Sequence, residues 1–381
     1  MNKKNKLPVL FLLDHIGYDQ GPVHGVTTYL VTVMPELRRA GQDSLLCVTR
    51  TPHPAALKRL EAVGIHPIFF HCKKFDPRAL FHLRKFLRTT EVGLIHVAQQ
   101  KSMALARVAG AAAEVPVLLH LHDPDRPGQL LQNVHRRYMQ PTDRVVGVSR
   151  EACERAADFH VAPERVEVLH NALDVHQYAA RASVARDRVR AELGLHADTP
   201  VIGTLSRLFP AKGHRGLLQS LPRILEKIPQ LTLLIPGEGP EREPCEQLVR
   251  ELGIQHAVRF LGQRGDIPEF LSALDLVIIA SREEGFPFAG VEAMACGVPV
   301  VAYGVGGVPE LVRDGRTGLL IRPGDASAMA AAIVDLMSNA TLRGQMRAGS
   351  LLAAEDFDIR THIARLQSIY ERMSPGAGTA A

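Results

Sequence analysis

The sequence REEGFPFAGVEAMACGVPVV, residues 282–301, follows one apolar run, LDLVIIAS at 274–281, and ends inside another, VPVVAYG at 298–304. Each run has the length and composition of a buried strand. Between them, residues 282–287 predict a loop and residues 288–296 a short helix, which Gly297 can end in the left-handed conformation before Pro299. A strand, a loop, a helix and a second strand form the repeating unit of a parallel sheet.

The same alternation of short apolar runs and longer amphipathic segments extends over the whole chain. Strand-like runs lie at residues 9–13, 44–49, 66–71, 93–98, 116–122, 144–149 and 166–170, and again at 201–206, 231–237, 258–262, 274–281 and 298–304. Strands that alternate with helices predict parallel sheets with helices on both faces. Because the series occurs twice, the sequence predicts an α/β fold of two doubly wound, Rossmann-like domains.

Composition places the domain boundaries. Residues 179–200 are polar and contain no strand-like run, so we place the first domain at 1–178 and the second at 179–358. A helix is expected at 359–373, where Ile363, Leu366, Ile369 and Tyr370 form an apolar stripe that needs a surface to pack on. The tail at 374–381 consists of small residues, proline and glycine, which predicts disorder.

Hydrophobic residues make up 46% and charged residues 22% of the 381 positions, as in ordinary globular proteins. The five cysteines are scattered without a C-x-x-C pair, which argues for a reducing compartment and against disulfides or structural zinc. The start MNKKNKLPVLFLLDHIG imitates a signal peptide, but its short apolar run meets Asp14 and His15, which favours a buried first strand. Without an apolar run of about 18 residues for a transmembrane helix, we expect a soluble, cytoplasmic protein.

Two cations flank the loop after the first strand of the second domain. In RLFPAKGHRGLLQSL, Arg207 and Lys212 precede a helix, and ligands of open parallel sheets bind beyond the carboxyl ends of the strands. Two cations and the amides of a helix N-terminus suit a diphosphate, although two solvated surface charges fit the spacing equally well. GEGPER at 237–242 lacks the third glycine of a dinucleotide fingerprint, and no P-loop motif occurs.

The segment HLHDPD, residues 120–125, ends a strand of the first domain. Side chains alternate along a strand, so His120 and His122 share one face. Together with Asp123 and Asp125 they suit a divalent metal, but no matching set of ligands occurs at other strand ends. The favoured interpretation is one functional histidine at the strand tip beside a structural one.

The two glutamates of the opening stretch stand eight residues apart, Glu284 on the loop and Glu292 a full turn into the helix. Carboxylates accept hydrogen bonds from hydroxyls, and the amides at the helix N-terminus favour anions or polar oxygens. This combination suits a polyhydroxyl ligand that carries phosphate. The alternative, one acid at a helix terminus and one solvated acid, is disfavoured because the helical neighbours of Glu292 are apolar.

These motifs resemble the retaining glycosyltransferases of family four (glycosyl transferases group 1), whose GT-B fold has two Rossmann-like domains facing across a cleft. Residues 280–325 resemble the family's E-x7-E region, and LSRLFPAKGHRGLLQSL resembles its G-R-L-x-x-x-K-G segment. Segments at 166–178, 233–243 and 258–281 also fit in order and spacing. In the first half, residues 21–41 resemble the family's glycine loop and first helix, and LLHLHD its histidine strand.

The resemblance implies a role for each matching residue in the second domain. Arg207 and Lys212 would hold the donor diphosphate, and Glu292 would accept hydrogen bonds from the ribose. Glu284 would contact the transferred sugar. The backbone contacts implied around the donor are those of Gly285, Phe286, Pro287 and Phe288 at the sugar, and Gly262 to Arg264 at the base.

In the first domain, the resemblance implies that Gly25 lets the phosphate approach the backbone and that His122 lies near the sugar at the reacting centre. The helix at 359–373 would cross back to this domain. The chain departs from the family pattern at Ser206, at residues 170–174 (HNALD) and at His24-Gly25, which replaces a glycine pair and puts the contact of Gly25 in doubt.

The implied reaction is transfer of a hexose-type sugar from a UDP- or GDP-sugar with retention of the anomeric configuration. Two cations and a helix dipole neutralise the leaving diphosphate, so no metal or other cofactor is expected. No side chain is an obvious nucleophile, which favours a front-face displacement in which the leaving phosphate takes the acceptor proton. Competing interpretations are a sugar-nucleotide epimerase or phosphorylase-like enzyme, a metallohydrolase, and a non-catalytic sugar-nucleotide-binding subunit.

One helix bears on the acceptor. Residues 1–178 hold 23 Lys and Arg against 17 Asp and Glu, and the segment 78–90 combines apolar residues with Arg84, Lys85 and Arg88. Basic amphipathic helices bind anionic membranes, although a core helix with a solvated basic face fits equally well. We expect a glycan or lipid-linked acceptor at the inner face of the cytoplasmic membrane, in bacterial cell-surface polysaccharide or lipopolysaccharide synthesis, and no nucleic acid partner.

Overall fold

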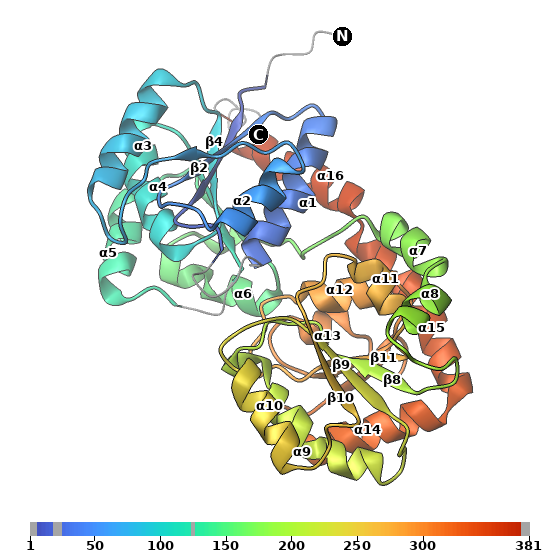
Figure 1. The fold of residues 1–381 in the computed structure, drawn as a ribbon. Coiled ribbons are helices and arrows are strands. Elements are labelled where there is room, and N and C mark those ends of the chain that lie inside the picture. The colour runs from blue at the N-terminus through green and yellow to red at the C-terminus, as the bar shows by residue number, and fades with distance from the viewer. Residues whose placement is uncertain (1–5, 18–24, 123–125, 375–381) are drawn as a thin grey trace. The chain divides into compact units, whose positions relative to one another are not determined.

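The computed structural model describes residues 6–17, 25–122 and 126–374. The chain divides into two compact units, which we call unit 1 and unit 2 (Figure 1). Unit 1 consists of Met1–His170 together with Ile359–Ala381, and unit 2 of Asn171–Asp358.

Unit 1 contains a seven-stranded parallel sheet in the order β3-β2-β1-β4-β5-β6-β7. Its elements are β1 (Val9–Leu13), α1 (Gly25–Arg39), β2 (Ser44–Val48), α2 (Pro54–Glu61), β3 (Ile68–Phe69), α3 (Arg78–Thr89), β4 (Leu94–Val97), α4 (Gln100–Ala113), β5 (Val117–Leu121), α5 (Gln129–Tyr138), β6 (Arg144–Gly147), α6 (Arg150–Glu154), β7 (Val166–Val168) and α16 (Ile359–Met373). β1, β4 and β5 are fully buried because they lie in the middle of the sheet. The red helix α16 packs beside the blue α1 in Figure 1, although most of the chain separates them in sequence.

Unit 2 contains a six-stranded parallel sheet in the order β10-β9-β8-β11-β12-β13. Its elements are α7 (Val175–Ser183), α8 (Arg186–Glu192), β8 (Val201–Gly203), α9 (His214–Leu225), β9 (Thr232–Pro236), α10 (Arg242–Glu251), β10 (Val258–Gly262), α11 (Ile267–Ser272), β11 (Leu276–Ile279), α12 (Phe288–Ala295), β12 (Val300–Tyr303), α13 (Val308–Leu311), β13 (Gly318–Ile321), α14 (Ala326–Ser338) and α15 (Ala340–Ala354). Helices α9, α10 and α14 pack together, and α7, α11, α12 and α15 form a second group across the sheet (Figure 1).

The two doubly wound sheets confirm the predicted fold class, and each of the twelve predicted runs contains a strand. The edge strand β13 was not predicted. Its sequence, GLLI, is a very short run between polar turns, and only pairing with β12 makes it a strand. The predicted loop and helix at 282–296 are present, and Gly297 ends α12 with φ +68°.

The sequence places the boundary between the units after residue 178, later than the structure does. Helix α7 belongs to unit 2, because it packs on α11 and α12 and because Tyr178 donates a hydrogen bond to Glu292. A polar segment marks a linker by composition, but the tertiary contacts of the residues before it decide which unit they join. Residues 375–381 of the predicted tail lie outside the described residues.

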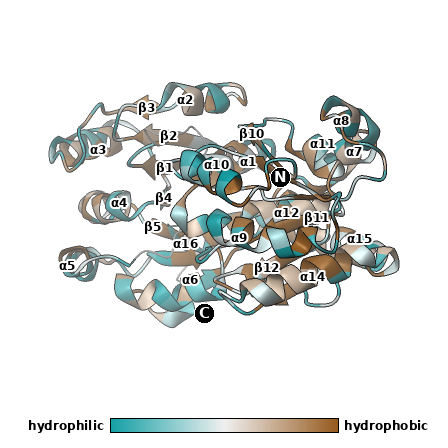
Figure 2. Cartoon of the chain, turned by 60° about the horizontal axis from the view of Figure 1, so that its bottom comes forward, coloured by the Kyte–Doolittle hydropathy of each residue, from teal (hydrophilic) through white to brown (hydrophobic). Residues whose placement is uncertain are grey.

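Hydropathy follows this architecture. In Figure 2 the strands β11 and β12 are brown, whereas the outer helix α5 is mainly teal. Each of the four residues of β11 and of β12 is buried, as expected for strands covered on both faces. None of the helices in the described residues is both long and apolar enough to cross a membrane.

Candidate functional site

Unit 2 brings its predicted site residues together at the switch point of its sheet. The chain order reverses between β8 and β11, which are neighbours, and the loops that leave their carboxyl ends therefore meet. The amide of Arg282 donates to the carbonyl oxygen of Ala211 at 2.8 Å. Gly213 adopts φ +71°, and a Cβ there would lie 1.9 Å from the carbonyl oxygen of Ala280, so only glycine permits this approach.

An ion pair joins the two loops. Lys212 Nζ lies 2.7 Å from Glu284 Oε1, and Ser281 Oγ donates to the same oxygen at 2.6 Å. The lysine and glutamate side chains are 22% and 10% exposed, so the pair is largely shielded from water. Since both bonds end on Oε1, Oε2 is the oxygen of Glu284 that is suited to accept from a hydroxyl of a ligand.

The second glutamate has a different partner. Tyr178 Oη donates to Glu292 Oε1 at 3.1 Å, and the tyrosine comes from α7, far away in sequence. Burial and the nearby carboxylate raise the pKa of Tyr178 well above its usual value, so the phenol keeps its proton. The hydrogen bond restrains the carboxylate of Glu292.

Hydrogen bonds to its carbonyl oxygens fix the backbone between the two glutamates. The amide of Gly307 donates to the carbonyl oxygen of Gly285 at 3.0 Å, and Asn171 Nδ2 donates to that of Phe286 at 2.8 Å. Gly306 adopts φ +55°, and a Cβ there would lie 1.6 Å from the carbonyl oxygen of Glu284. With their carbonyls held from behind, the amides of this loop and of the first turn of α12 are suited to donate to a ligand.

One predicted backbone contact needs correction. Pro287, the N-cap residue of α12, has no N–H and therefore cannot donate. The amides that can contact a ligand here are those of Gly285, Phe286 and Phe288. Proline instead fixes the backbone angle at which α12 begins, with φ −73°.

The remaining predicted residues of unit 2 flank this site. The Arg207 guanidinium lies 4.5 Å from the ring centroid of Phe209, in the loop after β8. Gly262 ends β10 with φ +68°, and its carbonyl accepts from the amide of Gly237 at 2.7 Å. The Arg264 side chain binds Asp266, with Nε 2.9 Å from Oδ1, so it is held by this carboxylate and its backbone remains the part suited to a ligand.

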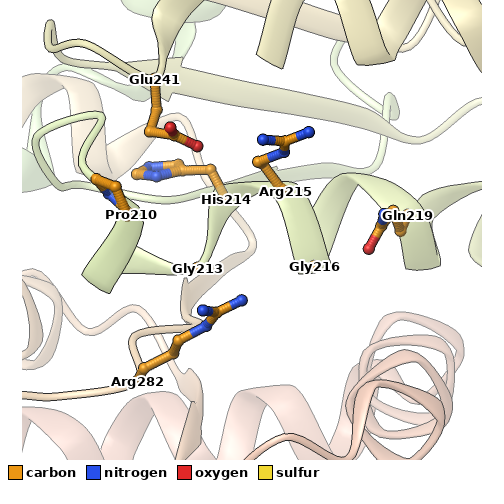
Figure 3. A pocket seen from close by; sticks show the side chains of 8 residues that line it. All are labelled: Pro210, Gly213, His214, Arg215, Gly216, Gln219, Glu241 and Arg282. Atoms are coloured by element: carbon orange, nitrogen blue, oxygen red, sulfur yellow. The ribbon is translucent and has the colours of Figure 1, made fainter. Parts of the chain in front are cut away.

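A pocket of about 340 Å³ opens beside the Lys212 loop, at the start of α9. Figure 3 shows its lining, in which the side chain of Arg282 extends from the β11–α12 loop below the helix. His214 begins α9, is buried, and shares a hydrogen bond of 3.1 Å between its Nε2 and Ser206 Oγ. Ser206, one of the departures from the family pattern, therefore anchors this helix.

Unit 1 holds the other two predicted residues. Gly25 is the first residue of α1, and apart from its chain neighbours and the backbone of α1 no atom of the described residues lies within 4 Å of the place where its Cβ would be. His122 follows β5, and its ring centroid lies 4.0 Å from that of His120. This confirms that the two histidines share one face of the strand.

His122, itself half-buried, packs against a group of buried rings, and together they form what we call the histidine–tyrosine cluster. Its members are Tyr29, His96, His120, His122, His362 and Tyr370. Burial lowers the pKa of His362 to about 4 and the pKa values of His96 and His120 well below their ordinary range. The three rings are therefore neutral at neutral pH.

Asp123 and Asp125, the carboxylates of the suggested metal set, lie outside the described residues. Within the described ranges, no group of three or more histidine, cysteine or carboxylate side chains could hold a metal ion. The histidines of HLHD instead pack against rings of other elements.

Several supporting residues were not predicted from the sequence. Ser281 and Gly306 lie within the quoted motif region, so their spacing was a usable signal. Tyr178 and Tyr29 also lie within matched segments, 166–178 and 21–41, but spacing could not show their contacts, because their partners lie 114 and 333 residues away.

Known families cover most of the chain. Residues 23–177 match the family described as Glycosyltransferase Family 4, and residues 185–350 match that described as Glycosyl transferases group 1. A 2-deoxystreptamine glucosyltransferase of Streptomyces kanamyceticus is 27% identical over 376 residues, 92% of this chain and 95% of the relative.

Two further similarities are informative. A GDP-mannose-dependent alpha-(1-6)-phosphatidylinositol monomannoside mannosyltransferase of Mycolicibacterium smegmatis is 34% identical over 246 residues, 61% of this chain and 63% of that protein's length. The crystal structure of Anabaena Alr3699/HepE in complex with UDP has a TM-score of 0.80 and 26% identity, covering 95% of this chain and 99% of that one. The chain belongs to the group 1 glycosyltransferases and has their GT-B fold of two Rossmann-like domains.

Proposed function

We propose that this glycosyltransferase moves a hexose-type sugar from a nucleoside diphosphate sugar to a glycan or lipid-linked acceptor, with retention of the anomeric configuration. The observation that carries the proposal is the arrangement at the switch point of unit 2. There a cation, Lys212, and two carboxylates with separate hydrogen-bond partners surround the N-terminus of α12.

Each part of this arrangement has a role in the proposed reaction. Lys212 and Arg207 neutralise the charge that develops on the leaving diphosphate, and the start of α12 adds amides and the positive end of a helix dipole. Glu284 binds the transferred sugar through Oε2, and Glu292 binds the ribose. Because protein cations carry the phosphate charge, we propose that the reaction needs no metal or other cofactor.

Retention is proposed to proceed on one face of the sugar. The bond from the anomeric carbon to the leaving phosphate oxygen breaks ahead of attack, which gives an oxocarbenium-like state. The acceptor hydroxyl then attacks from the same face, and its proton passes to the leaving phosphate. Glu284, with its charge shared between Lys212 and Ser281, is placed to stabilise the positive sugar ring.

The relatives support two bases for the donor. Anabaena Alr3699/HepE was also solved with UDP-glucose, and the mannosyltransferase relative depends on GDP-mannose. We therefore propose a UDP-sugar as the first donor to test and a GDP-sugar as the second.

A thermal-shift screen over UDP-glucose, other UDP-sugars, GDP-mannose and the free diphosphates identifies the donor, because a ligand that binds only the folded protein raises the melting temperature more at equal concentration the lower its Kd. Product is then analysed by NMR for the anomeric configuration. The expected result is an axial linkage from an axial donor, and an inverted linkage would contradict the proposed mechanism. Epimerisation of the donor in the absence of an acceptor would favour the epimerase alternative. Binding of the donor without any turnover would favour a non-catalytic sugar-nucleotide-binding protein.

The acceptor proposal rests on the surface of unit 1 around α3. This helix buries only Ala79 and Leu83, whereas Phe81 is 66% exposed and Arg84 and Lys85 are solvent-exposed. Exposed aromatic and basic side chains on one helix suit an anionic membrane surface. We propose a peripheral location at the inner face of the cytoplasmic membrane and a role in bacterial cell-surface glycan synthesis.

Sedimentation with phosphatidylglycerol vesicles tests the membrane contact. The wild type is expected to bind anionic vesicles at low salt and not phosphatidylcholine vesicles, and the variant Arg84→Glu/Lys85→Glu is expected to lose binding. The double variant Lys227→Glu/Arg223→Glu, with the same charge change on exposed residues of unit 2, serves as control. Absence of wild-type binding at every salt concentration would remove the membrane from the proposal.

A further inference from the structure

The histidine–tyrosine cluster contains two hydrogen-bonded chains, one that joins α16 to β5 and one that joins α16 to α1 and to the backbone of His170. In the first, Tyr370 Oη lies 2.7 Å from His96 Nδ1, and His96 Nε2 lies 3.0 Å from His120 Nδ1. In the second, Tyr29 Oη lies 3.2 Å from His362 Nε2, and His362 Nδ1 lies 2.9 Å from the carbonyl oxygen of His170. Both chains begin on α16, whose residues Tyr370 and His362 are buried.

The second chain has a single proton arrangement. A carbonyl oxygen only accepts, so His362 must carry its proton on Nδ1 and donate it to His170. His362 is neutral, so its Nε2 is a lone pair that accepts from the hydroxyl of Tyr29. Tyr29 is therefore held by a directed hydrogen bond from α1 to α16.

The ring of Tyr29 occupies the centre of the cluster. Its centroid lies 4.9 Å from that of His120 and 5.0 Å from that of His122, both edge-on. His122 thus packs against Tyr29 on one side and His120 on another. In the described residues the only hydrogen bond of the His120 ring is to His96, since its Nε2 has no partner, so His120 also depends on the chain from Tyr370.

Tyr29 also lies one helical turn after Gly25, the first residue of α1. Side chains of a helix point toward its N-terminus, so the residue that fixes Tyr29 also fixes the start of the helix. The two elements of unit 1 that carry predicted site residues, the start of α1 and the tip of β5, are therefore tied to the same ring.

We propose that Tyr29 is a positioning residue of the transfer reaction, and that His362 and Tyr370 of α16 make this C-terminal helix a part of the reacting centre by fixing His122 through Tyr29 and His120. The inference rests on the proposed function, to which we add the role that the family resemblance implies for His122, a place near the transferred sugar. It adds Tyr29, His362 and Tyr370, to which the resemblance to the family assigns no role in the reaction.

If Tyr29 and Tyr370 had a purely structural role, their substitution would change the melting temperature and leave kcat unchanged. Tyr29→Phe and Tyr370→Phe keep each ring and remove one hydroxyl, so they loosen the chains with little change in packing. Tyr138→Phe, a half-buried tyrosine of α5 outside the cluster, is the matched control. Each variant is measured for kcat, for binding of UDP and for melting temperature, with UDP-glucose as donor, or GDP-mannose if the screen selects it.

We expect kcat to fall about tenfold in Tyr29→Phe and severalfold in Tyr370→Phe, with UDP affinity within twofold of the wild type because Arg207 and Lys212, the cations assigned to the diphosphate, lie in unit 2. Tyr138→Phe should match the wild type. The decisive measurement is a double-mutant cycle with His122→Ala. If Tyr29 acts through His122, adding Tyr29→Phe to His122→Ala should lower kcat no further.

Three results would overturn the inference. Wild-type kcat in both Tyr29→Phe and Tyr370→Phe would do so, provided that His122→Ala is impaired, and would leave the proposed function intact. An equal loss from Tyr29→Phe with and without His122 would show a structural role only. Full activity of His122→Ala would remove both the inference and the role of His122 in the proposed function.

Discussion

The two Rossmann-like units hold their candidate site residues by different physical means. In unit 2 the site consists of charged side chains on short loops, where Lys212 and Glu284 pair and glycines let the loops approach each other. In unit 1 His122 is held by neutral rings that are buried between α1, the sheet and α16. One unit orients groups by charge and backbone, and the other by packing and neutral hydrogen bonds.

This difference predicts how each unit responds to charged ligands and to low pH. An ion pair at the edge of a sheet adapts to a charged ligand, because the same lysine can bind carboxylate or phosphate. A buried neutral histidine keeps its hydrogen bonds only while it stays neutral, because burial disfavours the charged form. The units should therefore respond differently to substitution of charges and to acid.

The largest effect is expected from the charged site of unit 2. Lys212→Ala should lower kcat/KM by about 1000-fold, because it removes a cation from the developing diphosphate charge. Glu284→Gln should lower kcat strongly with a smaller change in UDP affinity. Steady-state kinetics and UDP titration separate the two effects.

Lys227→Ala, which removes an exposed lysine just after α9, is the control for this substitution and should match the wild type. Activity of Lys212→Ala within fivefold of the wild type would show that Lys212 does not stabilise the charge of the donor diphosphate.

The next largest effect is expected from low pH, which should destabilise unit 1 more than unit 2. His362 has its pKa lowered from 6.5 to about 4, so the folded protein excludes a proton that the unfolded chain takes up below pH 6.5. Its stabilising contribution is complete above pH 6.5 and is lost as the pH falls to 4, by roughly 3 kcal/mol for such a shift. His96, His120 and His135 add losses of the same sign in unit 1, whereas His214 is the one described histidine of unit 2 with a lowered pKa.

Hydrogen–deuterium exchange at pH 7 and pH 5 checks this order, and unit 1 is expected to lose protection first. His135→Leu sharpens the test, because both ring nitrogens of His135 lack partners among the described residues, so the variant removes a titrating group without removing a hydrogen bond. Between pH 7 and pH 5, unit 1 of this variant should lose less exchange protection than unit 1 of the wild type. Earlier loss of protection in unit 2 would contradict the comparison.

A moderate effect on donor binding is expected from Tyr178, an uncharged side chain that donates a hydrogen bond to Glu292. Tyr178→Phe removes the hydrogen bond to Glu292, so the KM for the donor should rise about fivefold, as for one neutral donor to a carboxylate. kcat should change little, and discrimination between UDP and 2′-deoxy-UDP or 3′-deoxy-UDP should weaken. Tyr303→Phe, a buried tyrosine of β12, is the control. Unchanged KM and discrimination in Tyr178→Phe would remove its assigned role.

The smallest effect is expected from chelation. If Arg207 and Lys212 carry the phosphate charge, EDTA should change the transfer rate by less than about twofold, since protein cations take the place of a metal clamp. The rate is measured after dialysis against EDTA and again after addition of Mg²⁺ or Mn²⁺. A rate that disappears with EDTA and returns with the metal would show that the cations of unit 2 are insufficient.

The sequence alone determined the class of fold and the strands of the described residues other than β13. Apolar runs that alternate with amphipathic segments specify buried parallel strands and covering helices, because burial on both faces demands that pattern. The predicted residues of unit 2 also followed from sequence, since Glu284 and Glu292 belong to one strand–loop–helix unit. Spacing within such a unit is set by local geometry.

Only the tertiary structure decided which residues meet. The pairs Lys212–Glu284, Tyr178–Glu292, His96–Tyr370 and Tyr29–His362 span 72, 114, 274 and 333 residues. Their contacts depend on the strand order, which puts β8 beside β11 and β1 beside β4, and on the return of α16 to unit 1. A local apolar pattern records that a residue is buried, but its neighbour is chosen by how distant elements pack.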